Sequence, residues 1–434
     1  MGAKRAGIQS ILIPKVINRT QWINLKDKRQ QTGFNNFINN HLNTGKSRYA
    51  QFGYAYFGPV LFGFVQWLHK SIGNKKIFFF ARDGYLVKKV YDALFPESST
   101  DYIYLSRRAL SVPLLWKHSE WEEFSHYITV TRFFTVRSLL ERLGLNPERY
   151  KLEIQKFHLQ LDSNLQDNNF LQNKNLKAFY KSIREDVVQN SREEFVCLIA
   201  YFKKKNFYGD IAVMDIGWNG SMQRYLVEIM NISGIDARID GYYFGMRKNL
   251  KNSQVHGYFY EPSRMQMEPI ISFMQGLFES LFLSREGSTK RYDIHNGKAE
   301  PVLYEPEYHE NDIEFKAFQA IQEEALCFCK EYSKSPAAKL EKYKASEYSY
   351  NLLRFSTEPT LREAELFGNF RFYDTNVFPL AKPRSLLYYV RNPKIFSREF
   401  SYSAWKAGFM KRCFKINIPY MQMYMIAKVL AKRR

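Results

Sequence analysis

The sequence predicts an α/β protein with a mainly parallel sheet flanked by helices. Two stretches, IFFFARDGYLVKKVYDAL in residues 77–94 and IAVMDIGWNGSMQRYLVEI in residues 211–229, share one order of parts. In each, a short apolar run leads into a turn with charge and glycine, and an amphipathic helix follows. Wholly apolar strands are typical of parallel sheets covered on both faces. The repeated unit therefore indicates strands joined by helices.

Length and charge set the first bounds on function. The 434 residues are enough for two to three domains or one large domain, and 45% of them are hydrophobic, so we expect a sizeable core. The net charge of +21 favours anionic partners: nucleic acid, acidic lipids or phosphorylated substrates. No recognisable nucleic-acid-binding module accompanies this charge, so we expect no nucleic-acid partner.

Cysteine usage and apolar runs indicate the compartment. The four cysteines form no C-x-x-C pair, which favours a reducing environment. No secretory signal is visible near the start, and nowhere do 18 apolar residues run uninterrupted. We therefore expect a cytoplasmic protein without a spanning helix.

The first part of the chain leads from a basic arm into the α/β core. Residues 1–45 are basic and polar, and we expect a loosely held arm. The core is expected over residues 46–290. It opens with a mostly apolar stretch from Tyr54, within which we expect a helix that begins near Pro59 and ends at Gly73. This helix should pack against the sheet, whose first strand is predicted at residues 77–81.

Three further strands are expected, at residues 102–106, 210–215 and 238–245. Between the first two of these lies a polar, helix-rich stretch at about residues 119–205. We interpret it as a helical insertion or cap over the site, with an S-x-x-E capping box at Ser191 and Glu194.

The ends of the strands carry the candidate site. In open α/β sheets ligands bind outside the carboxyl ends of the strands, so the residues that follow three of these strands should converge. They are Arg82, Asp83, Arg107, Arg108 and Asp215. A glycine-bearing turn follows Asp215 and leads into a helix, and unpaired N–H groups with the helix dipole make an anion site there. It comprises Gly217, Trp218, Asn219, Gly220, Ser221 and Met222.

An ordinary βα connection would also explain this turn, which is neither a Walker A sequence nor G-x-G-x-x-G. The second turn of similar composition favours the ligand site. Residues 268–291 add Glu279, which is either an additional acid at the site or a solvated residue of an amphipathic helix.

We expect a C-terminal extension over residues 291–434. Its last part, residues 401–434, contains eight Lys or Arg and no acid, with aromatic and aliphatic residues interleaved. This pattern fits either a helix lying on an anionic membrane face or a basic helix docked on the domain. The interleaved residues are Trp405, Phe409, Phe414, Tyr420, Met423, Tyr424 and Ile426.

Several strings together resemble a set of bacterial polysaccharide-biosynthesis proteins. The strings FGPVLFGFVQWL, IFFFARDGYLVKKVYDAL, YIYLSRRALSVPLL, VMDIGWNGSMQRYL and DGYYFGM follow one another within about residues 50–290. In that family the module is similar to phosphoribosyltransferases and is often fused behind a haloacid-dehalogenase-type phosphatase domain. The resemblance implies transfer of 5-phosphoribose from phosphoribosyl pyrophosphate to a glycan during synthesis of a surface polysaccharide, O-antigen or capsule.

The resemblance also implies roles and partners. Residues 217–222 would hold the donor 5-phosphate, and Arg82, Arg107 and Arg108 would hold pyrophosphate. Asp83 is the first choice for the base and Asp215 the second, with Arg82 beside them. Asp215 stands where the family's donor motif usually has a pair of acids. Mg²⁺ would be held mainly by the donor, and no organic cofactor is expected.

The remaining partners follow from what the N-terminal arm contains. It has no D-x-D-x-[TV] phosphatase motif, so we expect a separate phosphatase to remove the 5-phosphate from the β-ribofuranosyl product. The glycan acceptor would be lipid-linked, at the inner membrane face. The alternative is a non-catalytic, membrane-associated scaffold of a polysaccharide synthase. A sugar-nucleotide glycosyltransferase would need a D-x-D metal motif, for which the chain offers no convincing context.

Overall fold

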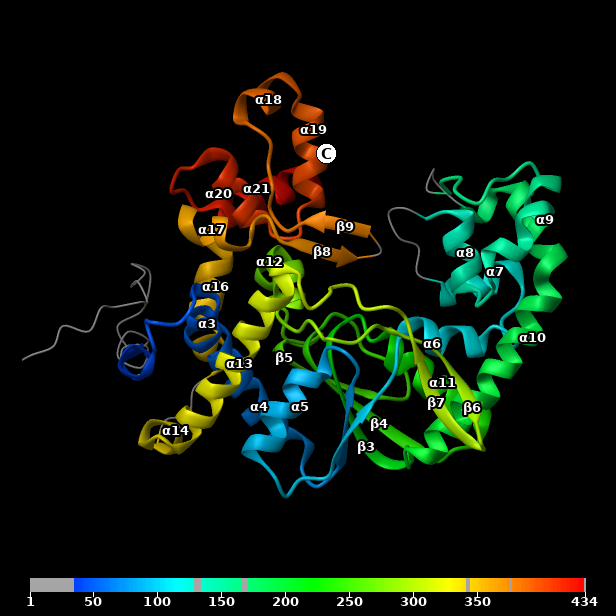
Figure 1. Ribbon diagram of the computed structural model, residues 1–434, viewed down its shortest axis with the longest axis horizontal. Helices are drawn as coiled ribbons and strands as arrows, with labels where there is room; N and C mark the ends of the chain where they lie inside the picture. Colours follow the sequence, from blue (N-terminus) through cyan, green and yellow to red (C-terminus); the bar gives the residue numbers. More distant parts are fainter. Residues whose placement is uncertain (1–34, 129–133, 166–169, 341–343, 375, 433–434) are drawn as a thin grey trace, which may run out of the picture.

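The computed structural model describes residues 35–128, 134–165, 170–340, 344–374 and 376–432. It contains a five-stranded parallel sheet of order β2-β1-β3-β4-β5, with helices on both faces (Figure 1). This confirms the predicted α/β class with a parallel sheet. The strands are β1 (Lys76–Phe80), β2 (Thr100–Ile103), β3 (Gly209–Trp218), β4 (Ala237–Met246) and β5 (Gln254–Tyr260).

The apolar runs of the central strands serve two cores. In β1, Ile77 and Phe79 point into one hydrophobic cluster, whereas Phe78 and Phe80 point into a second cluster on the opposite face. All four side chains are fully buried. Successive side chains of a strand point to opposite faces, so a strand covered on both sides must be apolar at every position. Truncating Phe79 to alanine would cost roughly 3–5 kcal/mol.

The helices of the first face come from both ends of the described chain. They are α3 (Arg48–Phe52), the π-helical segment η1 (Gly53–Phe57), α4 (Gly58–Ile72), α5 (Gly84–Leu94), α12 (Glu268–Ser280) and α13 (Ile313–Lys334). Helix α13 lies directly on η1: a Cβ added to Gly53 would come 2.1 Å from the carbonyl oxygen of Ile321 in α13. A glycine at this position therefore allows the two backbones to touch.

This packing corrects the expected domain boundaries. The boundary at residue 290 falls inside β6 (Thr289–His295), and α13 from the expected extension belongs to the main core. The expected arm, residues 1–45, also needs correction at its end, because Ile38 and Leu42 are buried in the same core. Residues 1–34 of that arm lie outside the described residues.

The second face is covered by α6 (Arg107–Ser111), α10 (Lys174–Lys204) and α11 (Ser221–Ser233). The segment between β2 and β3 forms no strand among its described residues. Its smaller helices, α7 (Trp121–Phe124), α8 (Val136–Arg142) and α9 (Lys151–Lys156), lie to one side of the sheet near α10 (Figure 1). The predicted capping box is wrong: Ser191 and Glu194 lie in the middle of α10, whose N-cap is Asn173.

The rest of the chain forms a hairpin and a C-terminal lobe. The hairpin joins β6 to β7 (Lys298–Leu303) and lies against α10. The remaining elements are α14 (Pro336–Leu340), α15 (Ala345–Tyr348), α16 (Tyr350–Thr357), α17 (Leu361–Phe367), β8 (Arg371–Asp374), β9 (Asn376–Pro379), α18 (Leu386–Arg391), α19 (Pro393–Tyr402), α20 (Lys406–Phe414) and α21 (Tyr420–Lys432).

Of the two alternatives for residues 401–434, the described part of the segment fits a basic helix docked on the domain. Trp405, Phe409 and Tyr420 are buried, and the indole N–H of Trp405 donates to the backbone oxygen of Ser356 at 2.7 Å. Most of the interleaved aromatic residues therefore pack inward, and only Met423 and Ile426 of the expected set are exposed. In the part of the chain that the structure describes, no helix combines the length and apolarity needed to cross a bilayer.

Candidate functional site

A cavity of about 450 Å³ opens at the carboxyl edge of the sheet. From β1 the chain moves outward to β2 on one side and then returns to the other side for β3, so the strand order reverses between β1 and β3. Such switch points are where open α/β sheets bind ligands. The predicted convergence of the first three strand ends is confirmed, and every predicted site residue lines this cavity: Arg82, Asp83, Arg107, Arg108, Asp215, Gly217, Trp218, Asn219, Gly220, Ser221, Met222 and Glu279.

The turn after β1 places Asp83 at the start of α5. Asp83 is the N-cap residue and Gly84 is the first residue of the helix. A Cβ on Gly84 would lie 2.9 Å from the Cβ of Phe79, so this glycine lets α5 start close against β1. The helix dipole at this end favours the negative charge of a carboxylate.

The turn after β3 depends on its two glycines. Gly217 has φ +125°, and a Cβ there would lie 2.2 Å from the carbonyl oxygen of Gly245. Gly220 is left-handed, with φ +66°, and is the N-cap of α11. No side chain caps this helix start, and Ser221 and Met222 of its first turn line the cavity. Uncapped amides at a helix N-terminus, facing a cavity, are suited to an anion.

Asp215 is an unusual residue because it is a carboxylate in a buried stretch of β3. It is 8% exposed, and its Oδ1 accepts a hydrogen bond from the N–H of Ile216 at 2.9 Å. Burial, and then the negative charge of Asp83, raise the pKa of Asp215 to about 8. Desolvation disfavours the charged form of a carboxyl, and a second carboxylate nearby disfavours it further.

Asp83 differs from Asp215 in its neighbours. Burial raises the pKa of Asp83, but the guanidinium groups of Arg82 and Arg107 oppose that rise. Asp215 therefore keeps its proton up to about pH 8 and can donate a hydrogen bond at neutral pH. Two guanidinium groups favour the carboxylate form of Asp83, whereas the charge of Asp83 disfavours the carboxylate form of Asp215.

The three arginines have different surroundings. Arg107 is exposed, and its guanidinium makes no hydrogen bond or ion pair with any residue that the structure describes. Arg82 donates to Oε1 of Glu307 at 2.7 Å, and both side chains are about one third exposed. Arg107 is thus available to a ligand, whereas Arg82 would have to exchange its partner.

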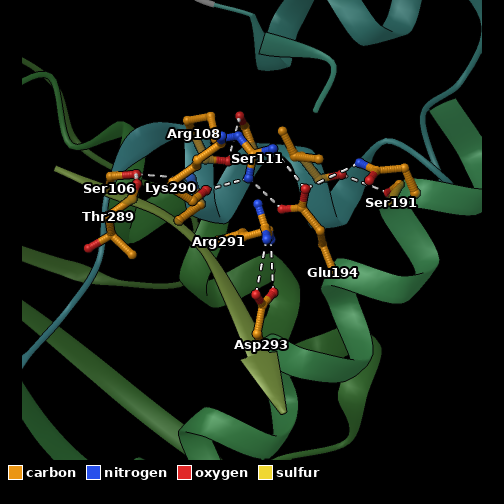
Figure 2. Close-up of polar contacts among 12 residues, drawn as sticks. Ser106, Arg108, Ser111, Ser191, Glu194, Thr289, Lys290, Arg291 and Asp293 are labelled. Atoms are coloured by element: carbon orange, nitrogen blue, oxygen red, sulfur yellow. Dashed lines mark hydrogen bonds and ion pairs between the residues drawn. The ribbon is translucent and has the colours of Figure 1, made fainter. Parts of the chain in front are cut away.

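Arg108 has another role from the one predicted. Its two terminal nitrogens donate to the two carboxylate oxygens of Glu194 at 2.6 and 2.8 Å, and one also donates to the carbonyl oxygen of Lys290 (Figure 2). Asn190 donates to the same carboxylate at 3.2 Å. The side chains of the ion pair are only 13% and 6% exposed, so separating them would leave a buried charge. Arg108 therefore ties α6 to α10 and is not a free pyrophosphate ligand.

Glu279 supports the glycine-bearing turn. Its Oε1 accepts hydrogen bonds from the indole N–H of Trp218 at 2.7 Å and from Gln275 at 2.8 Å. The guanidinium of Arg247 lies 5.9 Å from the centre of the Trp218 ring, and donates to Gln275 at 3.1 Å. Glu279 therefore lies at the site and is not a solvated residue of an amphipathic helix. Its hydrogen bond positions Trp218.

Some lining residues had no signal in the sequence. Glu307, Tyr308, Phe372 and Tyr373 come from the C-terminal part of the chain, and the rings of Tyr308 and Tyr373 meet edge to face at 4.7 Å. Residues in a loop, such as Tyr308, or in a four-residue strand, such as Tyr373, have no periodicity that would reveal them. Of the two expected roles of residues 119–205, the described residues fit a helical insertion and not a cap, because none of them lines the cavity.

No group of three His, Cys, Asp or Glu side chains within the described ranges is arranged to hold a metal ion. A scan against protein-family models and a search of the curated proteins find no match for this chain.

Proposed function

We propose that the protein transfers 5-phosphoribose from phosphoribosyl pyrophosphate to a glycan acceptor during synthesis of a bacterial surface polysaccharide. One observation carries the proposal: an uncapped helix start, two arginines and a pair of unlike carboxyls share one cavity at the switch point of a parallel sheet. Phosphate, pyrophosphate and a reacting hydroxyl need these three kinds of group. The resemblance of residues 50–290 to the polysaccharide-biosynthesis family supports the choice of donor.

The donor would lie across the ends of β1 and β3. Its 5-phosphate would accept hydrogen bonds from the first amides of α11, and its pyrophosphate would be held by Arg107 and Arg82, because guanidinium groups suit phosphate oxygens. The protonated carboxyl of Asp215 would donate to a ribose hydroxyl. Mg²⁺ would arrive with the donor, since pyrophosphate oxygens are preferred ligands, and would neutralise charge on the leaving group.

The reaction would be a single displacement at the anomeric carbon. The acceptor hydroxyl oxygen attacks C1, the hydroxyl proton passes to the Asp83 carboxylate, and the C1–O bond to pyrophosphate breaks with the electron pair leaving on pyrophosphate. Attack opposite an α-linked leaving group gives a β-ribofuranosyl 5-phosphate. Arg107 and Arg82 stabilise the charge that develops on pyrophosphate as the bond breaks. A separate haloacid-dehalogenase-type phosphatase would then remove the 5-phosphate.

The acceptor would enter past the aromatic wall that Tyr308 and Tyr373 form in the lining of the cavity. Sugar rings present apolar C–H faces that pack on aromatic rings. A lipid-linked acceptor would place the protein on the inner face of the cytoplasmic membrane as a peripheral protein.

Incubation with phosphoribosyl pyrophosphate, Mg²⁺ and candidate glycans tests the proposal by mass spectrometry, with a phosphopentose increase as the expected product. Calorimetric titration of the donor should separately show binding that Arg107→Ala weakens. Arg238→Ala is the matched control, since Arg238 is an exposed arginine at the opposite, amino-terminal edge of the sheet. Failure of the intact protein to bind the donor would reject the enzyme and leave the scaffold function.

A further inference from the structure

The most exposed cluster of aliphatic side chains in the C-terminal lobe lies on α18. Leu386, Leu387 and Val390 are 42%, 76% and 71% exposed. Helix α18 stands at the outer end of this lobe, away from the sheet (Figure 1). Isolated exposed leucines are common, but three within five residues on a protruding element form a patch that water disfavours.

Positively charged residues flank the patch in the sequence. Residues 382–394 contain Lys382, Arg384, Arg391 and Lys394 and no acid, and all four are exposed. Arg384 pairs with Glu399 at 3.0 Å, whereas the other three make no ion pair with a described residue. Exposed aliphatic residues flanked by unpaired cations match a surface with an apolar interior and anionic head groups.

The fold keeps these side chains outside. Tyr389, between the exposed residues, is 3% exposed and its hydroxyl accepts from the N–H of Arg384 at 2.9 Å while donating to Glu399. Rotating α18 to bury Leu387 would pull Tyr389 out of the lobe and break both hydrogen bonds. The exposure of the leucines is therefore part of the packed structure of the lobe.

We propose that α18 and its flanking residues 382–394 dock the protein on an anionic lipid bilayer, with Leu386, Leu387 and Val390 inserted among the acyl chains. A second copy of the chain fits this patch less well, because a two-fold contact would bring the same unpaired cations together. The docking residues are thus distinct from the aromatic residues of 401–434, which are mostly buried. Membrane association is part of the proposed function, but docking can be measured without donor or acceptor.

The position of the patch has a consequence for the acceptor. The lobe that carries α18 also contributes Phe372 and Tyr373 of β8 to the cavity. Because α18 stands at the outer end of the lobe, docking through it would leave the lobe between the lipid surface and the cavity, and a lipid-linked sugar would have to span the lobe to reach the cavity. This last step depends on the proposed function, whereas the docking itself does not.

Co-sedimentation with vesicles tests the proposal. The intact protein should bind vesicles of phosphatidylcholine with phosphatidylglycerol and bind pure phosphatidylcholine weakly. Leu387→Glu with Val390→Glu should lower the vesicle affinity about tenfold or more, because both the inserted groups and the local charge change. Leu152→Glu is the matched control, since Leu152 is 78% exposed on α9, and it should bind like the unchanged protein.

A second set of variants separates charge from insertion. Replacing Lys382, Arg391 and Lys394 together by glutamine should weaken binding at low salt and reduce its dependence on salt concentration. All variants change exposed residues, so their melting temperatures should stay unchanged. Unchanged vesicle binding by the Leu387→Glu, Val390→Glu variant would overturn the proposal. If this variant is a monomer where the unchanged protein is a dimer, and still binds vesicles, the patch is a dimer contact and the proposal is wrong.

Discussion

Replacing Asp215 by asparagine should make the protein more stable and less active. The pKa of Asp215 rises from its ordinary value of 3.8 to about 8 in the folded chain, first through burial and then through Asp83. Between these two values the native state keeps a proton that the unfolded chain has lost. The contribution of this proton to the free energy of unfolding is fully present below about pH 4 and is lost as the pH rises through about 8. Asparagine has nearly the same shape and carries no charge at any pH.

The magnitude follows from the difference between the two pKa values. A difference of about 4, at 1.36 kcal/mol for each pKa unit, sets an upper bound of about 6 kcal/mol on the gain at pH 8. Asp83 and Arg107 adjust to the charge, which reduces the effect, so we expect a gain of about 2–4 kcal/mol at pH 8 and almost none at pH 4.

Urea unfolding of both proteins at several pH values between 4 and 8.5 measures this gain. Asp210→Asn is the control, because Asp210 lies on the same strand and is largely exposed. A gap between the unchanged protein and Asp215→Asn that stays constant with pH would refute the argument. Donor binding should fall in the same variant, because the protonated carboxyl of Asp215 is proposed to donate to a ribose hydroxyl. A buried acid that lowers the stability of the fold is typical of a functional site.

Three further predictions follow from the site. Asp83→Asn should reduce turnover by about two orders of magnitude or more with donor affinity near normal, and equal turnover would move the base to another residue. Arg107→Ala should weaken donor binding about tenfold without changing the melting temperature. Arg108→Ala should instead destabilise the fold by roughly 3–5 kcal/mol, because it leaves Glu194 buried and unpaired. Calorimetry and thermal unfolding of both variants distinguish these outcomes. Tyr373→Ala should raise the KM for the acceptor about fivefold with unchanged donor affinity, as expected for a ring that stacks on a sugar, and a change in donor affinity would contradict this role.

Much of the sheet could be predicted because its strands are buried on both faces. Ile77 to Phe80 are apolar at every position, and the glycine turns after β1 and β3 mark where the strands end. β5 was missed because its sequence QVHGYFY mixes polar and aromatic residues and contains a glycine. The boundary at residue 290 was wrong because contacts between η1 and α13 leave no local mark on either segment.

In the candidate site, too, some features could be predicted from the sequence and others could not. Residues next to strand ends could be placed together, because parallel strands bring their carboxyl ends to one edge. The partner of a side chain could not be predicted in the same way. Arg107 and Arg108 are adjacent and chemically identical, yet Arg107 is exposed at the cavity and Arg108 pairs with Glu194. Glu307 and Tyr373 reach the cavity only through the fold of distant segments.

The contact between η1 and α13 also has a consequence for synthesis of the chain. Segment η1 and helix α4 are complete long before α13, which ends about 250 residues after α4 and β1. At roughly 5–20 residues per second, the ribosome needs about 12–50 s to supply that helix. During this interval the nascent chain carries the apolar side chains of η1 and α4, including Phe57 and Phe62, without their cover. A chain that stopped after β7 would retain this exposed surface permanently, so its expression should depend on chaperones that hold apolar segments.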